Sequence, residues 1–354
     1  MKHNTPGIAS RAFGKAGGKE VDLYTLTNEQ GMQVQVSTLG ATLVGVFVQD
    51  KHGEFDNVVL SMASAEDYLA DTAFLGRTVG PVANRIAQAQ FELDGVSYPL
   101  DKNDGEHCLH SGSSGLHNKV WDASGTLTAE GCELRLVVKH GHLEGGFPGN
   151  KQVEVRYLLG HDNTLRIVFH AESDLKTPIS LTNHAYFNLA AGGDVLSHQL
   201  QLRSGAITPV TDTLITTKDF MPVVNTPFDF EPAKTIGKAL VSDHKQMQIG
   251  SGYDHNYVLN SEGAPFAVLA DPQSGRRMTV STDMPGVQLY SANFVQGTQN
   301  AEGEHPFQQY AGVCLEAQNY PDTPNWPDRP DFWVSPERPY QAFIQYDFDV
   351  LSEI

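Results

Sequence analysis

The sequence has few cysteines and no excess of basic residues, and each shortage excludes a class of protein. Its 354 residues include 3 cysteines, at positions 108, 132 and 314. An odd number of scattered cysteines without a C-x-x-C pair indicates neither a disulfide framework nor a zinc-thiolate site. Lysine and arginine number 24 against 42 aspartates and glutamates, which gives a formal net charge of -18. Nucleic acid and anionic membranes are therefore not expected as partners.

Several motifs of catalysis and cofactor binding are also absent. There is no G-x-x-x-x-G-K-[ST] phosphate loop and no G-x-S-x-G nucleophile elbow, and Gly250 and Gly252 lack the third glycine and the following helix of a dinucleotide fingerprint. No hydrophobic run approaches the length of a membrane span, and residues 1–20 lack the apolar core of a secretory signal. We expect a cytoplasmic protein that uses no cofactor.

The sequence does contain a succession of short alternating or β-branched runs separated by turn residues. These runs cover residues 32–38, 42–49, 134–139, 152–159, 164–171, 198–202, 266–270, 277–281 and 341–348. Helical patterns are confined to residues 64–70 and 233–240, which are too short to form a layer. Because no linker divides the strands, we predict an all-β protein with few short helices. It would be a large antiparallel β-sandwich in a single domain over residues 21–354, after a flexible leader over residues 1–20.

One strand-like segment ends in a carboxylate that is placed to react. The apolar run at residues 311–315 leads into Glu316, and Pro321 and Pro324 mark the turn that follows. The end of a rigid strand is a common place for a reactive group. Glu316 is therefore our first candidate for a general base, and the alternative is an ordinary solvated carboxylate.

Further polar residues stand beside apolar strands in three other segments. Asn84 and Arg85 follow a Gly-Pro turn and could hold the hydroxyl groups of a ligand, although Arg85 could equally pair with a carboxylate. His184 lies between aromatic and amide neighbours, where its pKa could be tuned near neutrality, but a lone strand histidine is more often a satisfied core residue. Asp254 directly precedes an apolar strand and, taken alone, is typical of a turn or cap.

A fourth segment superficially resembles a metal site. His107 and His110 are spaced as H-x-x-H, with Glu106 and Cys108 beside them, but no second ligand cluster occurs at a known spacing. We favour His110 as a hydrogen-bonding histidine of a pocket, and no metal. The histidines, carboxylates and arginine that remain are acid-base groups suited to a neutral, hydroxyl-rich ligand.

Taken in order, these segments resemble the aldose 1-epimerase (galactose mutarotase) family from about Val21 to Phe348. The most specific phrases are Asn-His-Ala-Tyr-Phe-Asn-Leu at residues 183–189 and Cys-Leu-Glu-Ala-Gln-Asn at residues 314–319. Framework phrases of the same family occur at residues 39–41, 50–53, 91–98, 146–149, 227–230 and 285–290. The resemblance implies a galactose mutarotase-like sandwich with the sugar in an open cleft on one face.

The resemblance also implies an enzyme that interconverts the α and β anomers of free aldohexoses such as galactose and glucose. It makes Glu316 the general base and His184 the general acid of ring opening and closure, a reaction that needs no cofactor. It makes the following residues sugar-binding groups: Asn84, Arg85, His110, Asp254 and Gln288. An ionised Glu316 beside a protonated His184 would require an upward shift of the His184 pKa, which Asp254 or Glu316 could supply.

The sequence departs from the family pattern at two positions, and it leaves three other functions possible. Pro81 stands where many relatives carry arginine and Ser111 where glycine commonly follows the pocket histidine, and both could change the shape of the pocket. The other functions are a hexose-6-phosphate 1-epimerase using a cation such as Arg77, a non-catalytic sugar-binding or regulatory module, and a glycosidase that pairs Asp254 with Glu316. The partner would be a small monosaccharide, and the protein a monomer or homodimer.

Overall fold

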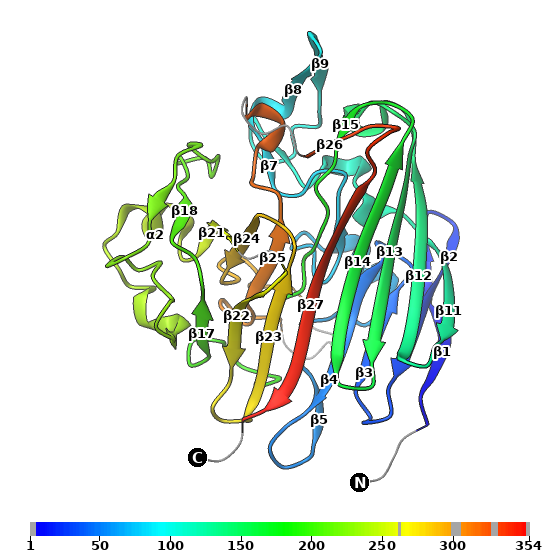
Figure 1. Ribbon diagram of the computed structural model, residues 1–354, viewed down its shortest axis with the longest axis vertical. Coiled ribbons are helices and arrows are strands. Elements are labelled where there is room, and N and C mark those ends of the chain that lie inside the picture. The colour runs from blue at the N-terminus through cyan, green and yellow to red at the C-terminus, as the bar shows by residue number, and fades with distance from the viewer. Residues whose placement is uncertain (1–4, 261–262, 299–305, 327–331, 352–354) are drawn as a thin grey trace.

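The structure is a computed structural model that describes residues 5–260, 263–298, 306–326 and 332–351 (Figure 1). Three sheets hold most of the strands, and their neighbouring strands pair antiparallel. The first sheet has the order β1 (Gly7–Ala16), β2 (Lys19–Thr27), β3 (Gln33–Ser37), β4 (Thr42–Gln49) and β5 (Phe55–Asn57). The second sheet has the order β11 (Asp122–Leu127), β12 (Gly131–His140), β13 (Lys151–Gly160), β14 (Thr164–Ser173), β27 (Tyr340–Val350), β23 (Arg276–Thr282), β22 (Pro265–Ala270), β17 (Gln199–Leu202) and β20 (Lys234–Thr235).

The third sheet and several short ladders complete the strands. The third sheet has the order β19 (Met221–Pro222), β18 (Ala206–Thr208), β21 (Asp254–Val258), β24 (Gly286–Tyr290) and β25 (Cys314–Gln318). The short ladders pair β10 (Cys108–Leu109) with β7 (Arg85–Ile86), β15 (Thr177–Pro178) with β26 (Trp333–Val334), β16 (Thr182–Asn183) with β6 (Thr78–Val79), and β8 (Gln90–Leu93) with β9 (Val96–Pro99).

Helices are short, as expected. The described residues form the α-helices α1 (Ala65–Ala70) and α2 (Lys245–Gly250), and 3₁₀ turns at Ala87–Ala89, Gly112–Ser114, Leu116–Asn118, Glu144–Gly146, Ile236–Ala239 and Thr323–Asn325. The helix predicted at residues 64–70 is α1, whereas residues 233–240 form β20 and a 3₁₀ turn, and α2 was not predicted. None of the described helices is long and apolar enough to span a membrane.

The core lies between the sheets. In β13 the side chains of Val153, Val155, Tyr157 and Leu159 are buried, while those between them are half-buried or exposed, because successive strand residues face opposite sides. They belong to one apolar cluster that also includes residues of the first and third sheets. Figure 1 shows β12, β13, β14 and β27 side by side in front, with β3 and β4 behind them. This arrangement confirms the predicted antiparallel sandwich.

The prediction of a flexible leader over residues 1–20 is wrong for the stretch from Gly7. Residues 7–16 form β1, which pairs with β2 along its length and continues the first sheet. Most of its side chains are exposed or half-buried, so the strand lacks the apolar alternation from which strands are recognised. Gly14, at φ +127°, lies at a bulge where a Cβ would collide with the Glu66 carboxylate. That residues 21–354 form a single domain stays a prediction.

Acid should destabilise this fold through buried histidines such as His255. His255 is fully buried, its Nδ1 accepts the N–H of Asp254 at 3.2 Å, and burial lowers its pKa to about 3. The unfolded chain takes up a proton near pH 6.5 that the folded protein refuses until about pH 3, so stability falls as the pH drops below ~6.5. From His255 alone, we expect the free energy of unfolding to fall by about 2 kcal/mol between about pH 7 and about pH 5.

Urea unfolding across this pH range tests the expectation. His255→Gln should flatten the pH dependence by about 2 kcal/mol, whereas the exposed His52→Gln should follow the wild type. Equal slopes in all three proteins would show that His255 is not held neutral.

Candidate active site

The third sheet turns a polar face toward a pocket. Glu316 of β25 lies opposite Gln288 of β24. Asp254 begins the next strand, β21, two residues before Asn256, which pairs with Gln288 from the other side. The residues between them point the other way, so that Leu315 and Leu289 belong to the core. Strand alternation therefore anchors the sheet on one side and presents acids and amides on the other.

All of the predicted site residues line one cavity of about 190 Å³. These residues are Asn84, Arg85, His110, His184, Asp254, Gln288 and Glu316. Sequence reasoning missed the aromatic walls of the same cavity, which are Phe74, Tyr186, Tyr290 and Phe294. No apolar periodicity or motif marked the segments of Phe74 and Phe294, and both belong to loops outside the strands.

Glu316 and His184 face one another in this cavity. Glu316 Oε2 lies 3.6 Å from His184 Nε2, and the two residues are only 2% and 5% exposed. Burial raises the pKa of Glu316 well above its usual value, aided by the negative charge of Asp254, and lowers that of His184 to about 4. Glu316 is therefore not a solvated strand-end carboxylate, and the expected upward shift of the His184 pKa is wrong.

Aromatic rings hold the imidazole of His184 in place. It follows β16 directly, and its backbone N–H donates to Arg77 O at 2.9 Å. Tyr186 and Phe74 stack on the ring at centroid distances of 5.0 and 6.1 Å. Phe74 itself has φ +58°, a left-handed conformation that few non-glycine residues adopt.

Asn84 and His110 orient one another at the end of a short ladder. Leu109 of β10 pairs with Arg85 of β7. Because the strands are antiparallel, His110, which follows Leu109, lies beside Asn84, which precedes Arg85. His110 donates its backbone N–H to Asn84 O at 3.0 Å, and its Nδ1 accepts the N–H of Asn84 at 3.1 Å. An imidazole whose Nδ1 accepts carries its proton on Nε2, and burial lowers the pKa of His110 well below its usual value. His110 is thus a neutral donor toward the cavity.

Arg85 brings a positive charge to the carboxylates of the cavity. Arg85 Nε lies 2.6 Å from Asp104 Oδ2, and its positive charge also lowers the pKa values of Asp254 and Glu316. Burial nevertheless raises the pKa of Asp254 overall. Gln288 Nε2 donates to Asp254 Oδ1 at 2.6 Å, so this aspartate serves the cavity and does not cap a turn.

The two departures from the family pattern lie outside the cavity lining. Pro81 and Ser111 do not line it. Ser111 Oγ accepts the N–H of Val82 at 2.8 Å and donates to Val82 O at 2.9 Å, so it ties the loop after His110 to the segment before Asn84. Any effect of Ser111 on the cavity passes through these neighbours.

The nearest approach to a metal site among the described residues is formed by His110, His184 and Glu316, whose ligand atoms lie within 4.8 Å of one another. The donors do not fit an ion, because His110 Nδ1 is occupied by an amide proton and Nε2 therefore keeps its own. His107, the other histidine of the H-x-x-H segment, accepts the N–H of Gln88 at 3.1 Å instead of joining this group.

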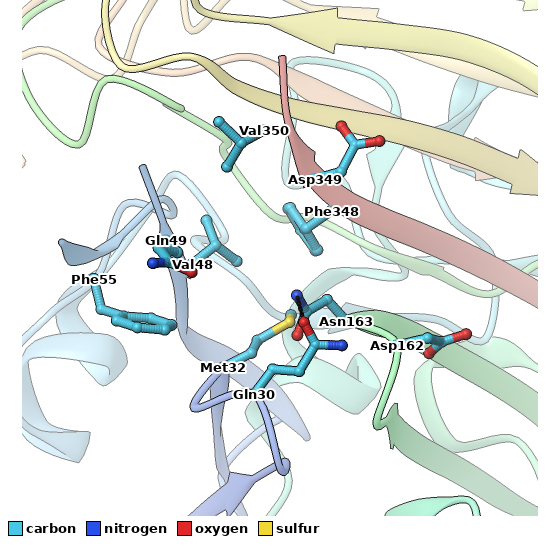
Figure 2. A pocket seen from close by; sticks show the side chains of 10 residues that line it. All are labelled: Gln30, Met32, Val48, Gln49, Phe55, Asp162, Asn163, Phe348, Asp349 and Val350. Atoms are coloured by element: carbon cyan, nitrogen blue, oxygen red, sulfur yellow. Dashed lines mark hydrogen bonds between the residues drawn. The ribbon is translucent and has the colours of Figure 1, made fainter. Parts of the chain in front are cut away.

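A larger pocket, of about 290 Å³, lies between the first and second sheets but lacks acid-base chemistry (Figure 2). Its carboxylates are Asp162 and Asp349, and Asp349 is engaged by Arg277 Nε at 2.6 Å. No histidine lines it. Size alone therefore does not identify the site.

The fold and the site define a β-sandwich protein with a buried acid-base pair in a pocket of hydrogen-bonding side chains. The aldose 1-epimerase family pattern matches residues 22–347. A galactose mutarotase from Rattus norvegicus is 34% identical over 349 residues, which cover 97% of this chain and 99% of that protein. An aldose 1-epimerase from Escherichia coli (strain K12) is 32% identical, with 98% and 99% covered.

Comparison with a solved structure supports the same family. The galactose 1-epimerase from Lactobacillus acidophilus NCFM superposes with a TM-score of 0.89 at 30% identity, covering 98% of this chain and all of that one. The chain therefore belongs to the aldose 1-epimerase family.

The backbone at Asn84 offers a test of how the site is built. Asn84 has φ +63°, which glycine adopts freely and alanine does not. Asn84→Gly and Asn84→Ala both remove the amide from the cavity, but we expect the alanine variant to be less stable than the glycine variant by about 1 kcal/mol in urea unfolding. Equal stabilities would show that the left-handed conformation is not imposed by the surrounding fold.

Proposed function

We propose that the protein is an aldose 1-epimerase that interconverts the α and β anomers of free aldohexoses such as galactose and glucose. The observation that carries this proposal is the facing pair of Glu316 and His184, 3.6 Å apart in a cavity walled by hydrogen-bonding groups. Membership of the family and full-length likeness to galactose mutarotases support the same activity.

Glu316 is the general base and His184 the general acid. Glu316 removes the proton of the C1 hydroxyl while His184 Nε2 delivers one to the ring oxygen, and the ring opens to the aldehyde. After rotation about the C1–C2 bond, His184 recovers the proton from the C5 hydroxyl and Glu316 returns one to the new C1 hydroxyl. No atom or electron is gained or lost by the protein over the cycle.

The reaction requires that the pair hold one proton. Burial opposes charge on both groups and outweighs the positive charge of Arg85, so the pKa of Glu316 is raised, that of His184 is lowered, and the shared proton rests on Glu316. The mechanism therefore begins with transfer of this proton from Glu316 to His184 Nε2 when the sugar binds. Because a carboxylate with a raised pKa is a stronger base than an ordinary one, burial also improves Glu316 for its task.

The remaining groups of the cavity bind the sugar hydroxyls. His110 donates from Nε2, Asp254 accepts, and Arg85 and Asn84 offer guanidinium and amide groups. Gln288 Oε1 and Glu316 Oε2 are buried acceptors without a hydrogen-bond partner among the described residues. Buried acceptors of this kind are normally satisfied, and hydroxyl donors of a sugar would satisfy them.

The other functions have less support. Arg77, the cation considered for a sugar phosphate, is buried, lies 3.8 Å from Asp71 and does not line the cavity, where Arg85 is the one lysine or arginine among the described residues. A binding module has no need of a buried acid-base pair. For a glycosidase, Asp254 would be the second carboxylate, yet it is engaged with Gln288.

Location and assembly stay proposals. The three cysteines are free and buried, which suits the cytoplasm, where thiols remain reduced. A monomer or homodimer, without nucleic acid or membrane as a partner, stays the expectation.

Removal of the base tests the mechanism. Glu316→Gln keeps the shape of the side chain but cannot accept a proton, so we expect polarimetry of freshly dissolved α-D-galactose to show a rate lower by about 10²-fold or more. Glu172→Gln, an exposed position on β14, is the matched control and should equilibrate the sugar as fast as wild type. A variant at position 316 that stays fully active would exclude Glu316 as the base.

The dependence of kcat/KM on pH should be bell-shaped. A second proton on the pair blocks the base in acid, and loss of the shared proton from the pair removes the acid in alkali, so activity falls on both sides. The measurement is polarimetry of galactose from about pH 4 to about pH 9, with His184→Asn as a variant that should be slow throughout. A flat wild-type profile across this range would contradict the assignment.

A further inference from the structure

Cys314 contacts the acid of the pair on the side away from the sugar. Its Sγ lies 3.6 Å from His184 Nδ1, within hydrogen-bonding distance for a sulfur atom. Cys314 is fully buried and does not line the cavity. Its influence on the reaction therefore passes through neighbouring side chains, of which His184 is the one whose imidazole its thiol meets.

One strand supplies partners for both edges of the imidazole. Cys314 and Glu316 are two residues apart on β25, so their side chains leave the same face about 7 Å from one another. The thiol lies near Nδ1 and the carboxylate near Nε2. The His184 ring is thus held between them.

We propose that Cys314 is a positioning residue that fixes the tautomer of His184: its thiol accepts the Nδ1–H of the imidazole, so that Nε2 is the atom that takes up and delivers the proton between Glu316 and the sugar. The inference rests on the proposed function, because it assigns the supporting partner of the general acid.

A thiol suits this position better than the alternatives. Burial, with the nearby charges of Glu316 and Asp254, raises the pKa of Cys314 well above its usual value, so it stays a neutral S–H. A neutral thiol can accept the Nδ1–H both of the protonated imidazole and of the neutral imidazole that has given up its Nε2 proton. A buried carboxylate here would retain the imidazolium, and an alkyl group would leave Nδ1 unpaired.

Among the residues that the structure describes, no other titratable side chain makes a hydrogen bond with Nδ1 of the ring. The groups that face His184 are His110, His117, Tyr186, Tyr290 and Glu316. His110 and Tyr290 meet it edge-on at 5.3 and 6.4 Å, and Tyr186 stacks on it. Glu316 approaches Nε2, which leaves Cys314 as the partner of Nδ1.

The test combines nitrogen NMR of histidine-labelled protein with steady-state kinetics for Cys314→Ala and Cys314→Ser. Cys132→Ala, which removes another free buried cysteine on β12, is the control. We expect the alanine variant to lose the single Nδ1–H tautomer of His184 and to have kcat lower by about tenfold, with KM within about twofold of wild type and the alkaline limb of its pH profile displaced. Serine, which can also donate and accept, should restore the tautomer and most of kcat.

The result that overturns the proposal is an alanine variant with the wild-type tautomer and pH profile. If Cys314→Ala does not fold, Cys314→Ser decides: serine with a tautomer mixture would equally contradict it. The NMR readout needs no turnover, so a wild type that fails to equilibrate sugars would refute the proposed function while the tautomer still reports on Cys314.

Discussion

The burial of the acid and base side chains is the constraint on which the site depends. Glu316, His184, His110 and Asp254 are all buried or nearly so, and burial moves each pKa toward the neutral form of the group. In water, the acid and base would be separately hydrated and weakly coupled. Inside the sandwich, a single proton shared by the facing groups is the stable arrangement, and this is the arrangement that the proposed mechanism uses.

Such a pair functions only if it cannot rearrange, and the sheets provide that rigidity. Glu316 and Gln288 lie in register on neighbouring strands whose opposite faces are packed into the core, so neither can retreat without disturbing it. His184 is confined by stacked aromatic rings, and His110 by reciprocal bonds to Asn84. The many strands that never touch the sugar thus contribute to catalysis by keeping a few atoms within reach of one another.

The sequence predicts the polar groups of the site better than their environment. Alternating strands revealed the sandwich, and distinctive phrases around His184 and Glu316 marked both residues. The direction of the His184 pKa shift was missed because it arises from burial, which a linear sequence does not display. Cys314 was missed as a partner because it meets His184 across 130 residues of chain. Strand β1 was missed because backbone pairing, and not an apolar face, secures it.

The central claim is that one sugar ring lies between Glu316 and His184 with its reacting oxygens turned to them. A crystal structure of Glu316→Gln with bound galactose measures this directly. The account predicts the C1 hydroxyl within about 3.2 Å of residue 316 and the ring oxygen within about 3.2 Å of His184 Nε2. A sugar bound with its ring oxygen away from both side chains, or in a different cavity, would contradict it.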